Sequence, residues 1–211
     1  NIGYVANVNF LPRQGSGTYF MWMCDDDLLA PTFLEQCVIL LDTNPQAIMA
    51  GANLIDFDDK GNRTPPRDPK KLYPSERDLY RRLKQYTLFY ESDGKDLFMF
   101  CAVWRREAVV SYVFVDYFIR YPGNWDFQDM NFVFWELAKG TFEFVDRVLF
   151  SKRAKYDSFG PQTKKSFPRR MFDTLVHSRL KRFITPFFYR RMGEIVNIKS
   201  LSVIARTKLL L

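Results

Sequence analysis

Three consecutive aspartates, Asp25, Asp26 and Asp27, follow an apolar and aromatic run that ends at Cys24. Adjacent carboxylates oppose one another's ionisation, so such a cluster needs water, a basic partner or a cation to stabilise it. Carboxylate oxygens are ligands that Mg²⁺ and Mn²⁺ accept. Taken alone, a solvated acidic turn or the first turn of a helix explains three aspartates about as well as a metal site does. The buried strand expected before the cluster and Pro31 after it favour the metal site.

Few other side chains in the sequence could support catalysis. The chain has one histidine, His177, and three cysteines, Cys24, Cys37 and Cys101, with no C-x-x-C pair. With so few histidines and cysteines, the chain is a poor fit to zinc sites and to Ser-His-Asp or Cys-His catalytic arrangements. An odd number of cysteines without such a pair is typical of a protein in a reducing compartment. We therefore expect carboxylates to carry the chemistry. The thiol of Cys24 is expected to face the core, without binding a metal.

Size and charge define the class of protein. With 211 residues, 47% of them hydrophobic, the chain can bury the core of one domain. The absence of a long apolar run and of a signal-peptide pattern predicts a cytoplasmic protein. The net charge is +7, but residues 151–211 hold 15 basic side chains against three acidic ones, a balance of +12. This asymmetry predicts a catalytic domain over 1–153 and a basic, aromatic, helical tail over 154–211.

The apolar pattern around the aspartates predicts a strand, an acidic loop and a helix. Residues 18–24 are apolar and aromatic, as in a buried strand that ends at the carboxylates. From Pro31 to about Asn44 the spacing is that of an amphipathic helix. A second strand is expected over 47–55, followed by a turn over 58–62 in which Gly61 can adopt positive φ.

The remaining pattern continues the alternation of helices and strands, which points to an α/β fold. In such sheets ligands gather at the carboxyl ends of the strands, where we expect the aspartates to lie. The further elements expected are a loop over 65–73, a helix from Ser75 to about Tyr90, a strand over 96–104, a helix over 125–139 ended by Gly140, and a strand over 142–150.

Several of these residues resemble the central segment of family 2 glycosyltransferases. The resemblance rests on Asn1-Ile2-Gly3, Asn9, Gly17-Thr18-Tyr19-Phe20, the three aspartates and Pro31, at the spacing seen in that family. Gln128-Asp129, followed by Leu137 and Gly140, resembles a later family segment, with Gln128 where Glu is usual. The resemblance covers about residues 1–153. It implies a GT-A-like mixed sheet flanked by helices, without the opening strands that hold the nucleotide base, as in the later part of a longer enzyme.

The resemblance also implies roles for the aspartates. Asp26 would be the first ligand of a Mg²⁺ or Mn²⁺ ion, with Asp27 assisting. Asp25 would lie nearer the ribose of a nucleotide-sugar donor and would be a third candidate ligand of the ion. Asn9 would lie on the nucleotide side. Asp129 would be the general base that deprotonates the hydroxyl of a glycan or lipid-linked acceptor, with inversion at the sugar. Judged alone, Asp129 is more commonly an exposed helix acid.

Four residues are candidates for the acceptor side: Trp104, Arg105, Trp125 and Gln128. Tryptophans can stack on sugar rings, but aromatic side chains at such positions more often belong to the core. Arg105 could contact phosphate or acceptor, and a solvated helix start explains it about as well. These alternatives stay open on the sequence alone.

The basic tail and the function each have further interpretations. Residues 165–211 are expected either to contact the inner face of a membrane or to pack as helices over the catalytic domain. The chain could instead be a non-catalytic remnant or binding module, or a metal-dependent phosphoryl-transfer enzyme acting on nucleic acid. Because no nucleic-acid motif accompanies the basic residues, we do not expect a nucleic-acid partner.

Overall fold

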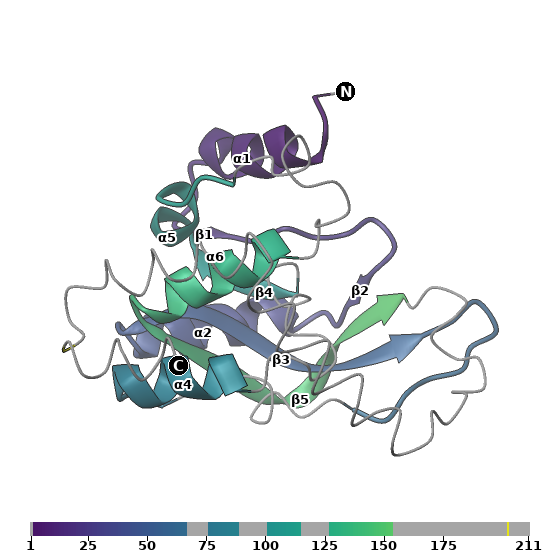
Figure 1. Cartoon of the computed structure of the whole chain (residues 1–211). Coiled ribbons are helices and arrows are strands. Elements are labelled where there is room, and N and C mark those ends of the chain that lie inside the picture. The colour runs from purple at the N-terminus through teal and green to yellow at the C-terminus, as the bar shows by residue number, and fades with distance from the viewer. Residues whose placement is uncertain (1, 67–75, 89–100, 115–126, 154–201, 203–211) are drawn as a thin grey trace, which may run out of the picture.

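The computed structural model describes residues 2–66, 76–88, 101–114, 127–153 and 202, with backbone alone at 84–88 and 127–131. In these residues five strands form one mixed sheet in the order β1-β4-β3-β5-β2. Only β3 and β5 pair in parallel, and the other neighbours are antiparallel (Figure 1). The strands are β1 Tyr19–Phe20, β2 Leu28–Leu29, β3 Ala47–Phe57, β4 Ala102–Arg105 and β5 Thr141–Arg153.

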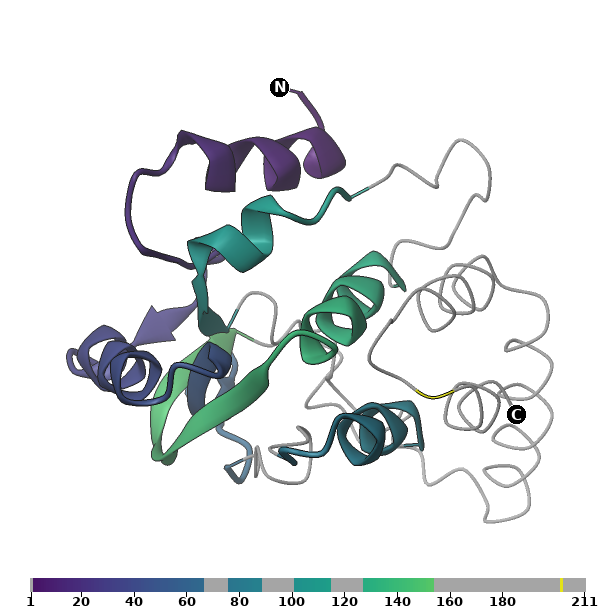
Figure 2. The same cartoon turned by 90° about the vertical axis from the view of Figure 1, so that its left-hand side faces the viewer.

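Helices cover both faces of this sheet. Helix α2 lies on one face, with α4 and α6 on the other, while α1 packs on α5 beyond the sheet (Figure 2). The helices are α1 Tyr4–Gln14, α2 Phe33–Thr43, α4 Leu79–Leu88, α5 Arg106–Val110 and α6 Phe127–Leu137. The expected α/β class is therefore confirmed for the described residues.

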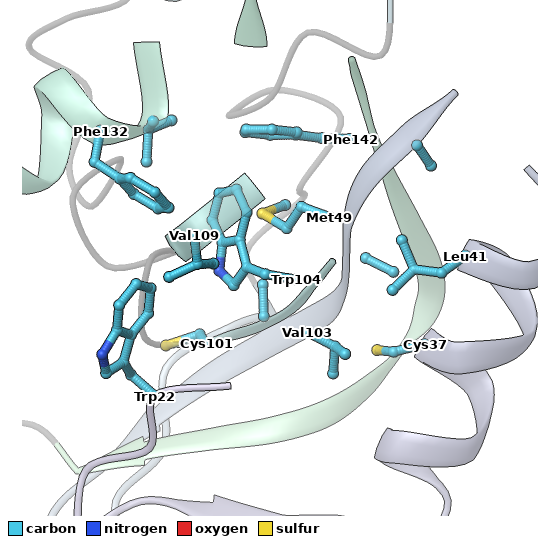
Figure 3. Packing of buried hydrophobic residues seen from close by; sticks show 14 of the residues in the cluster. Trp22, Cys37, Leu41, Met49, Cys101, Val103, Trp104, Val109, Phe132 and Phe142 are labelled. Carbon is cyan, nitrogen blue, oxygen red and sulfur yellow. The ribbon is translucent and has the colours of Figure 1, made fainter. Parts of the chain in front are cut away.

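The core surrounds strand β4, whose side chains alternate between the two faces of the sheet. Trp104 is fully buried, with its ring 4.8 Å from Phe132 of α6 and 5.4 Å from Phe142 of β5. Val103 points the other way, toward Cys37 and the rest of α2 (Figure 3). Both helix layers are thus anchored to the same short strand.

Most expected elements around the sheet are confirmed. The helix after Pro31 is α2, the strand over 47–55 is β3, and the turn after it has Gly61 at φ 81°. The Asp58 carboxylate accepts the backbone N–H groups of Lys60 and Asn62 and so holds this turn. The expected helix at 75–90 begins later, at Leu79, because the Asp78 side chain accepts the Arg81 N–H at 2.8 Å. Ser75 lies outside the described residues.

The prediction for the start of the chain was wrong in two respects. The expected strand over 18–24 is reduced to Tyr19–Phe20, because the next residues leave the sheet and Trp22 inserts edge-on against the rings of Phe20 and Phe132. Helix α1 was not anticipated, since its asparagine and β-branched residues favour helices weakly. It is held by tertiary contacts to the segment after α5.

Gly140 has a packing role in addition to the helix stop that was expected. Its N–H donates to the Glu136 carbonyl at the end of α6, as a helix stop should. Its φ is not positive, however, so left-handed backbone does not explain the glycine. A Cβ atom at Gly140 would lie 2.5 Å from the Gln46 carbonyl oxygen and from Ile48 Cγ2. The glycine therefore permits close packing of β5 against the start of β3.

Candidate metal centre

The three aspartates lie at the carboxyl ends of the two parallel strands. Strand β2, directly after them, pairs with the end of β5, with Leu28 opposite Ser151. Asp27 Oδ1 accepts the backbone N–H of Arg153, the last residue of β5, at 3.0 Å. The expected position at strand ends is therefore confirmed, although the strands are β3 and β5 rather than a strand formed by residues 18–24.

Three side chains in this loop form a group that could hold a metal ion. One ligand atom each from Cys24, Asp26 and Asp27 lies within 4.8 Å of the others. Asp25 is exposed and outside this group. The expectation that the Cys24 thiol faces the core was wrong: buried Trp22 takes the core position, and half-buried Cys24 lies with the carboxylates. The adjacency of Cys24 to the acids was the signal in the sequence.

Asp27 is the buried member of the group, with 5% of its surface exposed. Its Oδ2 atom is buried and has no hydrogen-bond partner in the part of the chain that the structure describes. Burial is the main reason that the pKa of this carboxyl lies above its usual value, and the charges of Asp26 and Asp56 raise it further. The Arg153 N–H and the charge of Lys152 oppose this shift. A cation beside Oδ2 would stabilise the charged carboxylate.

The same surroundings act on the thiol. Burial raises the pKa of Cys24, the negative charge of Asp27 raises it further, and Lys152 lowers it. Without a cation the thiol is therefore held in its protonated form at neutral pH. A metal ion that binds a thiolate favours loss of this proton.

The donor set fits a divalent cation. Two carboxylates suit Mg²⁺ or Mn²⁺, and three protein ligands leave positions open for water or substrate oxygen. Sulfur is a softer donor that Mg²⁺ does not favour. Mn²⁺ and the later divalent transition metals accept carboxylate and thiolate ligands together, with affinities that follow the usual order of these metals. If Cys24 binds, the site is better suited to a transition metal than to Mg²⁺.

Asn9, expected on the nucleotide side, is engaged by backbone. Its side-chain amide donates to the Phe114 carbonyl at 2.8 Å, and its Oδ1 accepts the Phe114 N–H at 2.9 Å. Arg13, one helical turn later in α1, donates to the Val110 carbonyl at 3.1 Å. The two side chains attach α1 to the end of α5 and to the segment that follows it. A contact between Asn9 and a nucleotide stays a prediction.

The acceptor-side candidates fall into two groups. Trp104 is fully enclosed in the core, so its ring is not available to stack on a sugar, and the core interpretation holds. Arg105 caps the start of α5, so the expected helix start is confirmed, but its half-buried side chain is not solvated. The guanidinium donates to the carbonyls of Leu41 and Ala47 at 2.6 and 2.8 Å, where α2 ends and β3 begins. Trp125 lies outside the described residues.

Gln128 and the expected base Asp129 lie in helix α6. Their side chains fall outside the description, so their relation to Cys24 and the aspartates stays a prediction. Strand β5, which follows α6, carries the Arg153 N–H that binds Asp27. The segment that resembles the base motif is thus connected through one strand to the candidate metal centre.

No protein-family model matches the chain, and the comparison with curated proteins gives no match. The resemblance to family 2 glycosyltransferases therefore rests on the sequence motifs alone. Within the described ranges, every helix is too short or too polar to cross a membrane. The basic tail expected over 154–211 lies outside the described residues except for Ser202.

Proposed function

We propose that this chain is an inverting glycosyltransferase that moves a sugar from a nucleotide-diphosphate sugar to a glycan or lipid-linked acceptor. The observation that carries the proposal is the buried Asp27 carboxylate, which has an unpartnered Oδ2 and lies with Asp26 and Cys24. Its position at the carboxyl ends of β3 and β5 supports the proposal, because ligands of α/β sheets bind there. The sequence motifs add the substrate class.

The aspartates divide the work of binding the donor. Asp26 and Asp27 hold a divalent ion, which when bound neutralises the charge that develops on the leaving diphosphate. Asp25 is exposed beside them and is assigned to the ribose. Because the buried Asp27 carboxylate is held by the Arg153 N–H, its position is fixed before the ion arrives. Fixed ligands of this kind reduce the reorganisation needed during reaction.

Asp129 is the proposed base for the acceptor hydroxyl. A sugar hydroxyl loses its proton far above neutral pH, so a positioned carboxylate assists its attack by about 10²- to 10⁴-fold. Attack from the face opposite the diphosphate inverts the anomeric centre. This role rests on the motif that spans Gln128 to Gly140, and α6 supplies a rigid element for it.

The proposal includes a GT-A-like arrangement and a tail that contacts a membrane. The mixed sheet with parallel β3 and β5, covered by helices on both faces, supports the first part. The second part rests on the charge and aromatic content of residues 165–211. Sedimentation of the whole chain with vesicles that contain or lack anionic lipid tests it, and equal sedimentation would contradict it.

The decisive experiment is calorimetric titration of Mn²⁺, and then of UDP, into the whole chain. We expect Mn²⁺ to bind and UDP to bind only in its presence. Asp26→Ala removes a ligand and should weaken Mn²⁺ binding by at least about tenfold. Asp25→Ala is the matched control: it removes the same charge from the neighbouring position but no member of the three-residue group.

Two outcomes would overturn the proposal. Binding of Mn²⁺ without any binding of UDP, in a chain shown by circular dichroism to be folded, would leave a metal centre with another chemistry. Equal loss of Mn²⁺ binding in Asp25→Ala and Asp26→Ala would show only that negative charge attracts the ion. In that case the group of Cys24, Asp26 and Asp27 is not a metal centre.

A further inference from the structure

A cavity of about 470 Å³ lies at the opposite ends of the same two strands. Its walls include Gln46 and Thr141, beside the first residues of β3 and β5, and four basic side chains: Arg77, Arg82, Arg105 and Lys139. Glu107 is the acidic residue of its wall. The length of β3, roughly 30 Å, separates this basic cavity from the candidate metal centre. The two sites can therefore be tested independently.

Arg82 is the informative residue of the basic cavity. Only 5% of its surface is exposed, and no carboxylate of the described residues is in contact with it, a rare combination for a charged side chain. Its guanidinium donates to the carbonyls of Leu137, Glu76 and Arg77 at 2.7 to 2.9 Å. Burial lowers the pKa of Arg82, and the charge of Asp78 acts against this from a distance. Its Nη2 takes part in none of these bonds.

Neutral carbonyls orient the buried Arg82 and the half-buried Arg105 without cancelling their charge. Arg82 is fixed by the last turn of α6, and Arg105 by the Leu41 and Ala47 carbonyls. A guanidinium held in this way presents its remaining N–H groups at a fixed position, and planar guanidinium groups match the geometry of phosphate oxygens.

Basic side chains outnumber acidic ones in the wall of the basic cavity. The wall contains three arginines and Lys139, which is paired with Glu136 at 2.7 Å, against one acidic residue, Glu107. Arg77 is exposed and has no ion-pair partner among the described residues. The wall itself therefore carries an excess of positive charge. A buried guanidinium with an open cavity beside it needs a counter-anion.

We propose that the basic cavity binds a phosphate group, as the free ion or as part of a small molecule or a lipid headgroup. Arg82 and Arg105 supply oriented charge from the wall, and Arg77 closes over the ligand from the exposed side. The cavity has room for more than inorganic phosphate, because small-molecule pockets begin at about 300 Å³. This site goes beyond the proposed transferase activity, and it does not depend on the metal centre.

The test is titration of inorganic pyrophosphate into the whole chain in the presence of EDTA, at constant ionic strength. EDTA removes metal-dependent binding of diphosphate at the aspartates. We expect saturable binding that Arg77→Gln weakens by at least about fivefold, because a charge-assisted contact is lost. The matched control is Arg81→Gln: Arg81 is exposed in α4 and carries the same charge, but it is not part of the cavity wall.

A second variant and NMR signals from the cavity wall distinguish loss of pyrophosphate binding from loss of folding. Arg82→Lys keeps the charge but loses the planar fork, and it should weaken pyrophosphate binding in a chain that still unfolds cooperatively. Amide signals of Gly140 and Thr141 in NMR spectra should shift on binding. Absence of saturable binding, or equal weakening in Arg77→Gln and Arg81→Gln, would overturn the proposal. Competition by phosphatidic acid vesicles, but not by phosphatidylcholine vesicles, would assign the phosphate to a lipid headgroup, and its absence to a soluble molecule.

Discussion

Each end of the parallel strand pair has a buried carboxylate with one oxygen that lacks a hydrogen-bond partner among the described residues, and the two carboxylates differ in their neighbours. At the candidate metal centre, Asp27 Oδ1 accepts the Arg153 N–H, and Oδ2 is the oxygen without a described partner. Beside the basic cavity, Glu136 Oε1 accepts a hydrogen bond from Lys139 at 2.7 Å, and Oε2 is the oxygen without a described partner. Burial raises the pKa of both groups, that of Glu136 to about 7.

The difference in neighbours determines which ion each end can accept. Asp27 is surrounded by further acids, so the positive charge it requires must come from outside the cluster or from Lys152 at longer range. Glu136 already has its cation in Lys139, and the wall of the adjacent cavity contains three arginines against one acidic residue, Glu107. Similar burial thus favours a cation beside Asp27 and an anion beside the arginines, which is the basis of both proposals.

The largest expected effect comes from removing the core that both ends share. Trp104 is fully buried between Phe132 and Phe142, so Trp104→Ala should lower the free energy of unfolding by about 3–5 kcal/mol. Trp104→Phe keeps a ring and should cost less. Urea unfolding followed by circular dichroism measures both. A loss below about 1 kcal/mol for Trp104→Ala would mean that the two ends do not depend on one core.

The central elements of this fold could be predicted because their pattern is strong. The apolar spacing of α2 and the apolar run of β3 identified both elements, and the resulting α/β alternation placed the aspartates at strand ends. The run before the aspartates misled because its aromatic residues pack one by one against the core. Trp22 satisfies burial without belonging to a strand.

The sites were predictable only in part, because they depend on contacts distant in sequence. The aspartates were visible as a cluster, but the burial of Asp27 comes from its position beside Arg153, 126 residues later. The basic cavity was not visible at all, because its four basic residues come from three separate segments: Arg77 and Arg82 from the first, Arg105 from the second and Lys139 from the third. No local pattern shows that Arg82 is buried with no carboxylate of the described residues in contact.

A second prediction concerns pH and separates the two carboxylates. Because folding raises the pKa of Glu136 from 4.5 to about 7, the folded state binds the proton more tightly than the unfolded state. Stability should therefore fall as pH rises from 4.5 through about 7, by roughly 3 kcal/mol for this group. Glu136→Gln should remove this part of the pH dependence, as measured by urea unfolding at several pH values.

The matching variant at the other end is Asp27→Asn, which removes the titratable carboxyl group and with it the contribution of Asp27 to the pH dependence of stability. The pKa of Asp27 is also raised, so its contribution to stability should likewise fall as pH rises above 3.8. In wild type, Mn²⁺ should reverse that loss of stability at Asp27 and leave the Glu136 contribution unchanged.

The Glu136 prediction has its own contradicting outcome. If the free energy of unfolding varies with pH in parallel for wild type and Glu136→Gln, then folding does not raise the pKa of Glu136.

The smallest expected effect concerns Lys152, whose charge lowers the pKa of both Cys24 and Asp27. Lys152→Gln removes a positive charge beside the proposed ion and should tighten Mn²⁺ binding about fivefold, equivalent to about 1 kcal/mol. The same change raises the pKa of both ligands, which strengthens competition by protons. When Mn²⁺ displaces one proton from a ligand, the site still gains one positive charge. Repulsion from Lys152 therefore opposes Mn²⁺ binding whether or not a ligand has to lose a proton first. Arg147→Gln, at an exposed position on β5, is the matched control and should leave calorimetric Mn²⁺ affinity nearly unchanged. Weaker binding in Lys152→Gln would show that Lys152 orients a ligand rather than repelling the ion, and the contrast between the two ends would then not be one of charge alone.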